Sequence, residues 1–117
     1  MYRKAYQLAM EIFDISKQWP LDECYALTGQ VRRSFRSVCS NMREAWAKRF
    51  YPAHFVSKLT DADGENAETE TWLDFAQDSG YLSATDHDRL ISETRQIGAM
   101  LGSMIHKPEP FLLRKRF

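Results

Sequence analysis

Apolar side chains recur at spacings of three and four over four long stretches of the chain. This spacing places them on one face of an α-helix, so it predicts four amphipathic helices. The stretches cover about residues 2–19, 28–50 and 53–79, and a last one from Ser83 to just before Pro108. No stretch shows the alternating pattern of a strand, and the sequence therefore predicts an all-α chain.

Proline, glycine and serine mark the expected ends of these helices. Pro20 should end the first helix because proline lacks a backbone N–H, and Pro52 suits the first turn of the third helix. Gly80 is expected to end the third helix in a left-handed conformation. Ser83 should then cap the fourth helix, with Asp86 three residues further on.

The connections between the predicted helices are short, which favours antiparallel neighbours. A chain of 117 residues has the length of one domain. We therefore predict an antiparallel up-and-down four-helix bundle over residues 1–107. Residues 108–117 form a tail that is first apolar and then basic.

Each predicted helix has an apolar stripe that should face the core. The stripe of the third helix is heptad-like, as in a bundle. Two of its members, Asn66 and Thr69, are polar, so the middle of this seam should be hydrated or hydrogen-bonded. The four stripes comprise Tyr2, Ala5, Tyr6, Ala9, Ile12, Phe13 and Ser16; Val31, Phe35, Val38, Met42, Ala45 and Trp46; Phe55, Leu59, Ala62, Asn66, Thr69, Leu73 and Ala76; and Leu90, Thr94, Ile97, Leu101 and Met104 or Ile105.

The middle of the second helix is unusually polar, with Ser37, Ser40 and Asn41 close together. Such side chains can bond to the preceding turn of their own helix. They can also reach across to Glu68 or Glu70 on the third helix. We interpret these five residues as a structural polar network rather than a catalytic site.

Composition limits the range of partners and compartments. The formal net charge is zero, so an electrostatic partner must be bound by a local patch rather than by the whole molecule. The N-terminal stretch lacks the pattern of a secretory signal, and no apolar run is long enough to span a membrane, so we expect a cytoplasmic protein. Cys24 lies in a predicted loop, and about ten helical residues separate Cys39 from the start of the second helix by roughly 15 Å, which is too far for a disulfide between them. We expect an exposed Cys24 and a Cys39 that fills the core.

Charge is distributed unevenly between the two central helices. The second helix carries one acidic residue, Glu44, and six basic ones: Arg32, Arg33, Arg36, Arg43, Lys48 and Arg49. The third helix carries seven acidic residues and one basic residue, Lys58. Either the two helices neutralise each other, within one bundle or between subunits, or the arginines stay exposed and contact phosphates.

The sequence contains no convincing motif for a catalytic or metal site. The run that begins at Asp61 lacks the glycine and the glutamate that a calcium loop needs at its sixth and twelfth positions. His54, His87 and His106 are not spaced as metal pairs with one another or with a cysteine. No nucleophile and base are recognisable as a pair. We predict a protein that is not an enzyme and that holds no cofactor or metal.

Four segments resemble a known family. Residues 27–33 read LTGQVRR and residues 37–44 read SVCSNMRE, similar to the family signature L-T-x-Q-[IV]-R-R followed by S-[IV]-P-S-N-[IA]-x-E. Residues 67–73, AETETWL, are similar to its A-E-L-E-T-x-L, and Gly80-Tyr81-Leu82 matches its helix-ending turn. The family is that of bacterial four-helix-bundle proteins encoded in 23S rRNA intervening sequences. The accessory variability determinant of diversity-generating retroelements resembles the same fold.

The resemblance implies a cytoplasmic bundle that assembles as a homo-oligomer, typically a homopentamer, with a role near nucleic acid. The chain departs from the family pattern at Cys39, where proline is usual, at Asn66 and Thr69, which replace apolar residues, and at Arg43 and Ala47. Our leading hypothesis is a non-enzymatic oligomer that binds RNA or DNA through the six basic residues of the second helix. The alternative is a structural or adaptor protein with a protein partner, in which the basic helix pairs with the acidic third helix.

Overall fold

The computed structural model describes residues 1–114 and is helical throughout its regular elements. Four α-helices follow one another along the chain: α1 (Tyr2–Ser16), α2 (Leu27–Ala47), α3 (Pro52–Asp78) and α4 (Ala84–His106). Two short 3-10 turns, η1 (Leu21–Glu23) and η2 (Glu109–Phe111), lie before α2 and after α4. The predicted all-α four-helix bundle is confirmed. The basic end of the tail, residues 115–117, lies outside the described residues.

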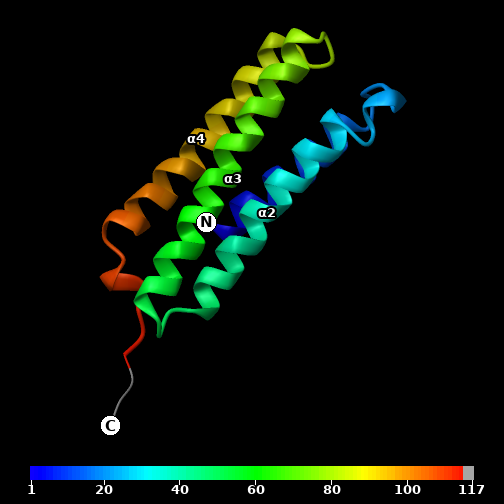
Figure 1. Cartoon of the computed structure of the whole chain (residues 1–117). Coiled ribbons are helices and arrows are strands. Elements are labelled where there is room, and N and C mark those ends of the chain that lie inside the picture. The colour runs from blue at the N-terminus through cyan, green and yellow to red at the C-terminus, as the bar shows by residue number, and fades with distance from the viewer. Residues whose placement is uncertain (115–117) are drawn as a thin grey trace.

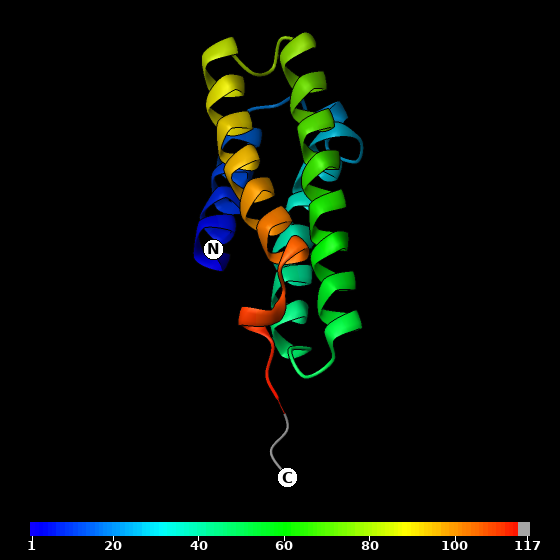
Figure 2. The same ribbon diagram turned by 90° about the vertical axis from the view of Figure 1, so that its left-hand side faces the viewer.

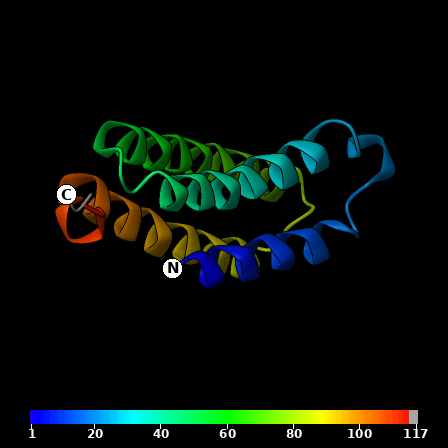
Figure 3. The same ribbon diagram turned by 90° about the horizontal axis from the view of Figure 1, so that it is seen from below.

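The four helices pack side by side in chain order. α2 packs against α3, α3 against α4, and α1 against both α2 and α4. Figure 1 shows α2, α3 and α4 along the long axis, and the views in Figures 2 and 3 show α1 lying beside α4 and α2. The result is an elongated bundle of about 58 × 24 × 19 Å.

α1 is the shortest of the four helices and covers only part of its neighbours. Near its start, the Nζ atom of Lys4 lies 2.9 Å from a carboxylate oxygen of Glu93, in the middle of α4. Towards its end, Glu11 pairs with Arg89. The last turns of α2 and α4 therefore extend past the start of α1, and one end of the bundle is built from three helices only (Figure 2).

Most of the predicted core is confirmed. All seven members of the α3 stripe are buried, as are Val31, Phe35, Val38, Met42 and Ala45 of α2. On α4, Met104 rather than Ile105 completes the buried stripe. The prediction was wrong for Trp46, which is 48% exposed, and for Tyr2 and Tyr6 of α1. Trp46 lies beyond the start of α1, where no fourth helix covers it, whereas Tyr2 and Tyr6 belong to the first two turns of α1 and are 37% and 53% exposed.

The helix ends mostly follow the expected signals. Gly80 has a φ of 82° at the end of α3, and the Ser83 hydroxyl accepts a hydrogen bond of 3.0 Å from the Asp86 N–H at the start of α4. The prediction was wrong for α1, which ends at Ser16 rather than Trp19. The chain leaves the helix through a turn in which the Trp19 N–H bonds to the Ser16 carbonyl, before Pro20 is reached.

A buried polar layer crosses the middle of the bundle. The hydroxyls of Ser34 and Thr69 lie 2.7 Å apart and join α2 to α3. The Asn66 amide donates to the Thr94 carbonyl at 2.8 Å, and the Thr94 hydroxyl donates to Glu70 at 2.6 Å, joining α3 to α4. The polar α3 seam is therefore hydrogen-bonded, as expected. These bonds satisfy the three hydroxyls and the Asn66 amide nitrogen, whereas the Asn66 amide oxygen is buried without a hydrogen-bond partner among the described residues.

Candidate nucleic-acid interface

Three arginines of α2 face the aromatic rings of α1. We call Arg32, Arg36 and Arg43 the α2 stripe. The guanidinium carbons of Arg32 and Arg36 lie 4.6 and 5.6 Å from the ring centre of Phe13. That of Arg43 lies 4.8 Å from the ring centre of Tyr2. These are cation–π distances, so the α2 stripe follows the seam between α1 and α2 rather than α3.

Arg32 is the structural member of the α2 stripe. Its side chain is half-buried, and its Nε donates to the Ser16 hydroxyl at 2.8 Å. A second guanidinium nitrogen lies 3.3 Å from the Phe13 carbonyl oxygen. A cation at the last carbonyls of a helix interacts favourably with the helix dipole. Arg32 therefore holds the end of α1 on α2 and has few donors left for a ligand.

Arg36 and Arg43 are exposed members of the α2 stripe. Within residues 1–114, neither side chain is within ion-pair distance of a carboxylate. Stacking on a ring uses the flat face of a guanidinium and leaves the N–H groups at its edge for other acceptors. These two residues therefore keep both their charge and their donors.

Arg33 points to α3 instead. It pairs with Glu68 and lies 3.2 Å from Glu65, and its Nε donates to Gln30. A second α2–α3 ion pair joins Glu44 to Lys58 at 2.9 Å. Neutralisation within one bundle is therefore confirmed for Arg33, whereas no ion pair among residues 1–114 joins the α2 stripe to α3. Neutralisation of the α2 stripe between subunits stays a prediction.

Lys48 and Arg49 follow the last turn of α2. The Arg49 guanidinium lies 4.1 Å from the Trp46 ring, and its Nε donates to the Trp46 carbonyl at 2.9 Å. Lys48 is exposed. Both cations lie at the three-helix end of the bundle, beyond Arg43.

The five residues of the predicted polar network fall into separate sets of bonds. The Asn41 amide donates to the carbonyl and the hydroxyl of Ser37, and the Ser40 hydroxyl also bonds to the Ser37 carbonyl. Glu68 accepts from Arg33 and from the Trp72 indole, whereas Glu70 accepts from Thr94. Of the two alternatives for α2, the structure shows the local one, with bonds to the preceding turn.

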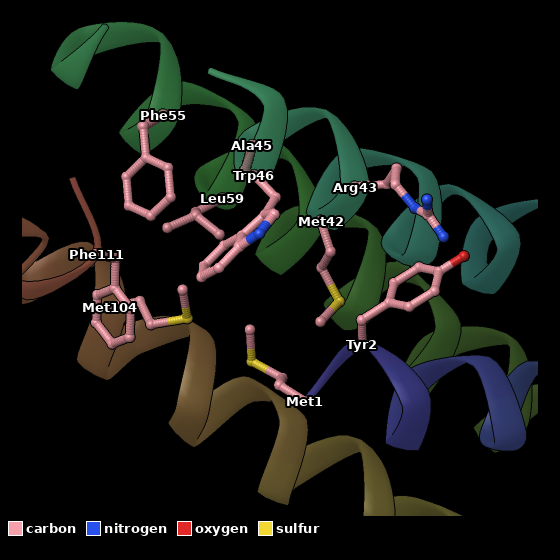
Figure 4. Close-up of a pocket in the computed structure, with 10 residues that line it drawn as sticks. All are labelled: Met1, Tyr2, Met42, Arg43, Ala45, Trp46, Phe55, Leu59, Met104 and Phe111. Carbon is pink, nitrogen blue, oxygen red and sulfur yellow. The ribbon is translucent and has the colours of Figure 1, made fainter. Parts of the chain in front are cut away.

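An apolar groove opens at the three-helix end, next to the α2 stripe. Its volume is about 460 Å³. Figure 4 shows side chains from α2, α3, α4 and the start of the chain around it, with Trp46, Met1 and Met104 near its centre and Arg43 beside Tyr2 at one edge. The lining residues are Met1, Tyr2, Met42, Arg43, Ala45, Trp46, Phe55, Leu59, Met104 and Phe111. Arg43 is the only charged side chain among them.

The two cysteines and the potential metal ligands do not form a reactive site among residues 1–114. Both cysteines are free, with Cys24 exposed and Cys39 buried. Burial raises the pKa of the Cys39 thiol to about 11, against a smaller opposing effect of its backbone hydrogen bond, so this thiol is a poor nucleophile. Across residues 1–114, no three histidine, cysteine or acidic side chains are grouped so that they could hold a metal ion. In the same part of the chain, no helix is long and apolar enough to cross a membrane.

Comparison with known proteins decides the family. The family model of the 23S rRNA-intervening sequence protein matches residues 1–103. The chain belongs to this family. A solved structure from Bacteroides thetaiotaomicron, a protein of unknown function from the S23 ribosomal protein family, is 26% identical to it with a TM-score of 0.82. The alignment covers 91% of this chain and 95% of that one. No curated protein matches the chain.

Within this 23S rRNA-intervening sequence family member, sequence reasoning missed the partners of the arginines. Tyr2 and Phe13 were expected in the core, whereas they form the aromatic side of the α1–α2 seam. The signal was present, because aromatic residues on α1 and arginines on α2 both recur at helical spacing. An antiparallel pair of helices brings two such rows together.

Proposed function

We propose that this protein is a non-enzymatic, oligomeric nucleic-acid-associated protein that binds the phosphate backbone of RNA or DNA through α2. The observation that supports this most directly is the state of Arg36 and Arg43. Both are exposed, both rest on aromatic rings, and both keep donors for a phosphate. Lys48 and Arg49 extend the same positive surface to the end of the bundle.

The chain as a whole has no net charge, so only a local positive surface such as that of α2 can attract phosphates. Four of the seven acidic residues of α3 have partners outside the α2 stripe: Arg33 pairs with Glu65 and Glu68, Thr94 donates to Glu70, and His87 bonds to Asp74. They therefore do not neutralise the α2 stripe. A cationic surface of this kind contacts phosphates without reading the bases, and its affinity falls steeply with salt.

The test compares two charge-matched double variants in a salt-dependent binding titration with duplex DNA and structured RNA. Arg36→Gln/Arg43→Gln removes two cations from α2, and Arg89→Gln/Arg95→Gln removes two from α4. Each lost phosphate contact lowers the log–log salt slope on duplex DNA by about 0.9, so the α2 variant should lose about 1.8 per subunit. The α4 variant should keep the wild-type slope. Equal slopes for both variants would reject the α2 surface.

We also propose that the chain self-associates into a homo-oligomer, and the family resemblance suggests a pentamer. Support comes from large apolar side chains exposed at the end of the bundle opposite the groove. Leu21 and Tyr25 are 91% and 98% exposed, and Phe75 lies beside Trp72 at the same end. Exposed apolar residues of this size are typical of subunit contacts. Light scattering of the wild type and of Leu21→Glu/Tyr25→Glu tests this, and a wild-type monomer at micromolar concentration would contradict it.

A further inference from the structure

The groove and the α2 stripe have one residue in common, Arg43. Tyr2 stacks on Arg43 and lines the groove, and Arg43 belongs to both. Trp46, one helical turn after Met42, lines the groove on one side and is covered by Arg49 on another. An apolar cavity with aromatic walls therefore opens beside cations that have no acidic partner in the part of the chain that the structure describes.

The groove has the size and lining of a site for a small, flat, aromatic group. Its volume of about 460 Å³ lies in the range of ligand pockets, at roughly 300–1,000 Å³. Aromatic surface comes from Tyr2, Trp46 and Phe111. The methionine side chains of the lining are flexible and polarisable, so they can adjust to the shape of a ligand (Figure 4). A ligand that fits both the groove and its edge combines a flat aromatic ring, which can stack, with a negative charge a short distance away.

A nucleotide with an unpaired base has this combination. We infer that the groove takes a base of single-stranded nucleic acid, which stacks on Trp46 and Tyr2, while the flanking phosphates bind Arg43 and Arg36. The inference rests on the proposed function and narrows it. In a duplex the ring faces are buried between neighbouring pairs, whereas a single strand offers its bases to aromatic side chains.

The test uses three probes of equal length: an unstructured single strand, the same sequence as a duplex, and an abasic strand. The abasic strand keeps the phosphates and lacks the rings. Stacking of one base on an aromatic side chain supports at least about a fivefold gain in affinity, so the single strand should bind at least fivefold tighter than the abasic strand. Binding of the single strand should also quench tryptophan fluorescence, because the base stacks on Trp46.

Three variants separate stacking from charge. Trp46→Leu should weaken the single strand by about fivefold and leave the salt slope unchanged. Arg43→Gln should lower the slope on single strands by about 0.7. Met10→Leu, a change at an exposed apolar side chain of α1 outside the groove, should alter neither. If Trp46→Leu does not fold, Tyr2→Leu replaces it at the edge of the same groove.

The outcomes distinguish this inference from the function on which it rests. Equal affinity for the single strand and the abasic strand, with a steep salt slope, overturns the base site and leaves phosphate binding intact. A wild-type protein that binds none of the probes at low salt overturns both. A Trp46→Leu variant that keeps its affinity for the single strand but changes its oligomeric mass assigns the groove to a subunit contact and overturns the inference.

Discussion

The guanidinium of Arg43 lies over the ring of Tyr2, with 4.8 Å between its central carbon and the ring centre. One residue belongs to the last third of α2 and the other to the first turn of α1. The pair therefore links two helices by a contact that does not cancel the arginine charge. Phe13 has the same role for Arg32 and Arg36 further along the seam. The seam between α1 and α2 thus keeps its positive charge, whereas Arg33 and the acidic α3 neutralise each other.

The members of the α2 stripe should differ in their effect on stability. Arg32→Gln should lower the free energy of unfolding by about 1.5 kcal/mol or more, because it removes charged hydrogen bonds to Ser16 and the Phe13 carbonyl. Arg36→Gln, at an exposed position, should lower it by less than about 0.5 kcal/mol. Urea unfolding followed by circular dichroism measures both, and equal losses would show that Arg32 does not fix the end of α1.

The hydroxyl pair in the core should be energetically coupled. Ser34→Ala should cost about 1 kcal/mol, because it breaks the buried bond between α2 and α3. Thr69→Val also removes the bond to the Glu65 carbonyl and should cost at least as much. If the two hydroxyls bond to each other, the double variant should cost at least about 0.5 kcal/mol less than the sum of the single variants. Strict additivity would contradict the pair.

Helical periodicity was sufficient to predict the fold and the core of α3. All seven residues of that stripe are buried because α3 has neighbours along its whole length. The same reasoning failed at Trp46 and Tyr2, since periodicity identifies a helix face but not the length of the helix that covers it. The short α1 determines which parts of α2 and α4 stay open.

The candidate site was only partly predictable for a related reason. Composition located the arginines on one helix, and spacing located Arg32, Arg36 and Arg43 on one face of it. Which neighbour that face meets depends on the rotation of α2 within the bundle, and a single sequence does not specify it. The groove depends on the ends of three helices together, so no local motif indicates it.

His87 should make stability depend on pH. Burial lowers its pKa, but the hydrogen bonds that its ring donates to the Asp74 and Asp88 carboxylates, together with their negative charge, raise it by more, so the net pKa is above the usual value. A raised pKa in the folded state stabilises the protein below about pH 6.5, and this contribution is lost as the pH rises through the folded-state value. Because both carboxylates are exposed, the effect should be about 0.2–1 kcal/mol. His87→Gln should narrow the difference in stability between pH 6 and pH 8, and an unchanged difference would contradict this assignment.

The two thiols should differ in reactivity. Cys24 is exposed, whereas Cys39 is buried and its raised pKa keeps it protonated at pH 8. A thiol reagent should modify one cysteine per chain in the folded protein and two in denaturant, with or without prior reduction. Two thiols that react at equal rates in the folded protein would contradict the burial of Cys39, and a loss of both without reductant would indicate a disulfide.

The central claim is that the α2 surface binds nucleic acid through phosphates. The most direct measurement is the affinity of the folded, assembled wild-type protein for RNA and DNA as a function of salt concentration. Arg36 and Arg43 alone, each contacting one phosphate, give a log–log slope of about −1.8 on duplex DNA for one subunit. Contacts by Lys48 and Arg49, or an oligomer that engages several subunits, should make the slope steeper. A folded wild-type protein that binds neither RNA nor DNA at low salt, or whose affinity does not change with salt, would contradict the account.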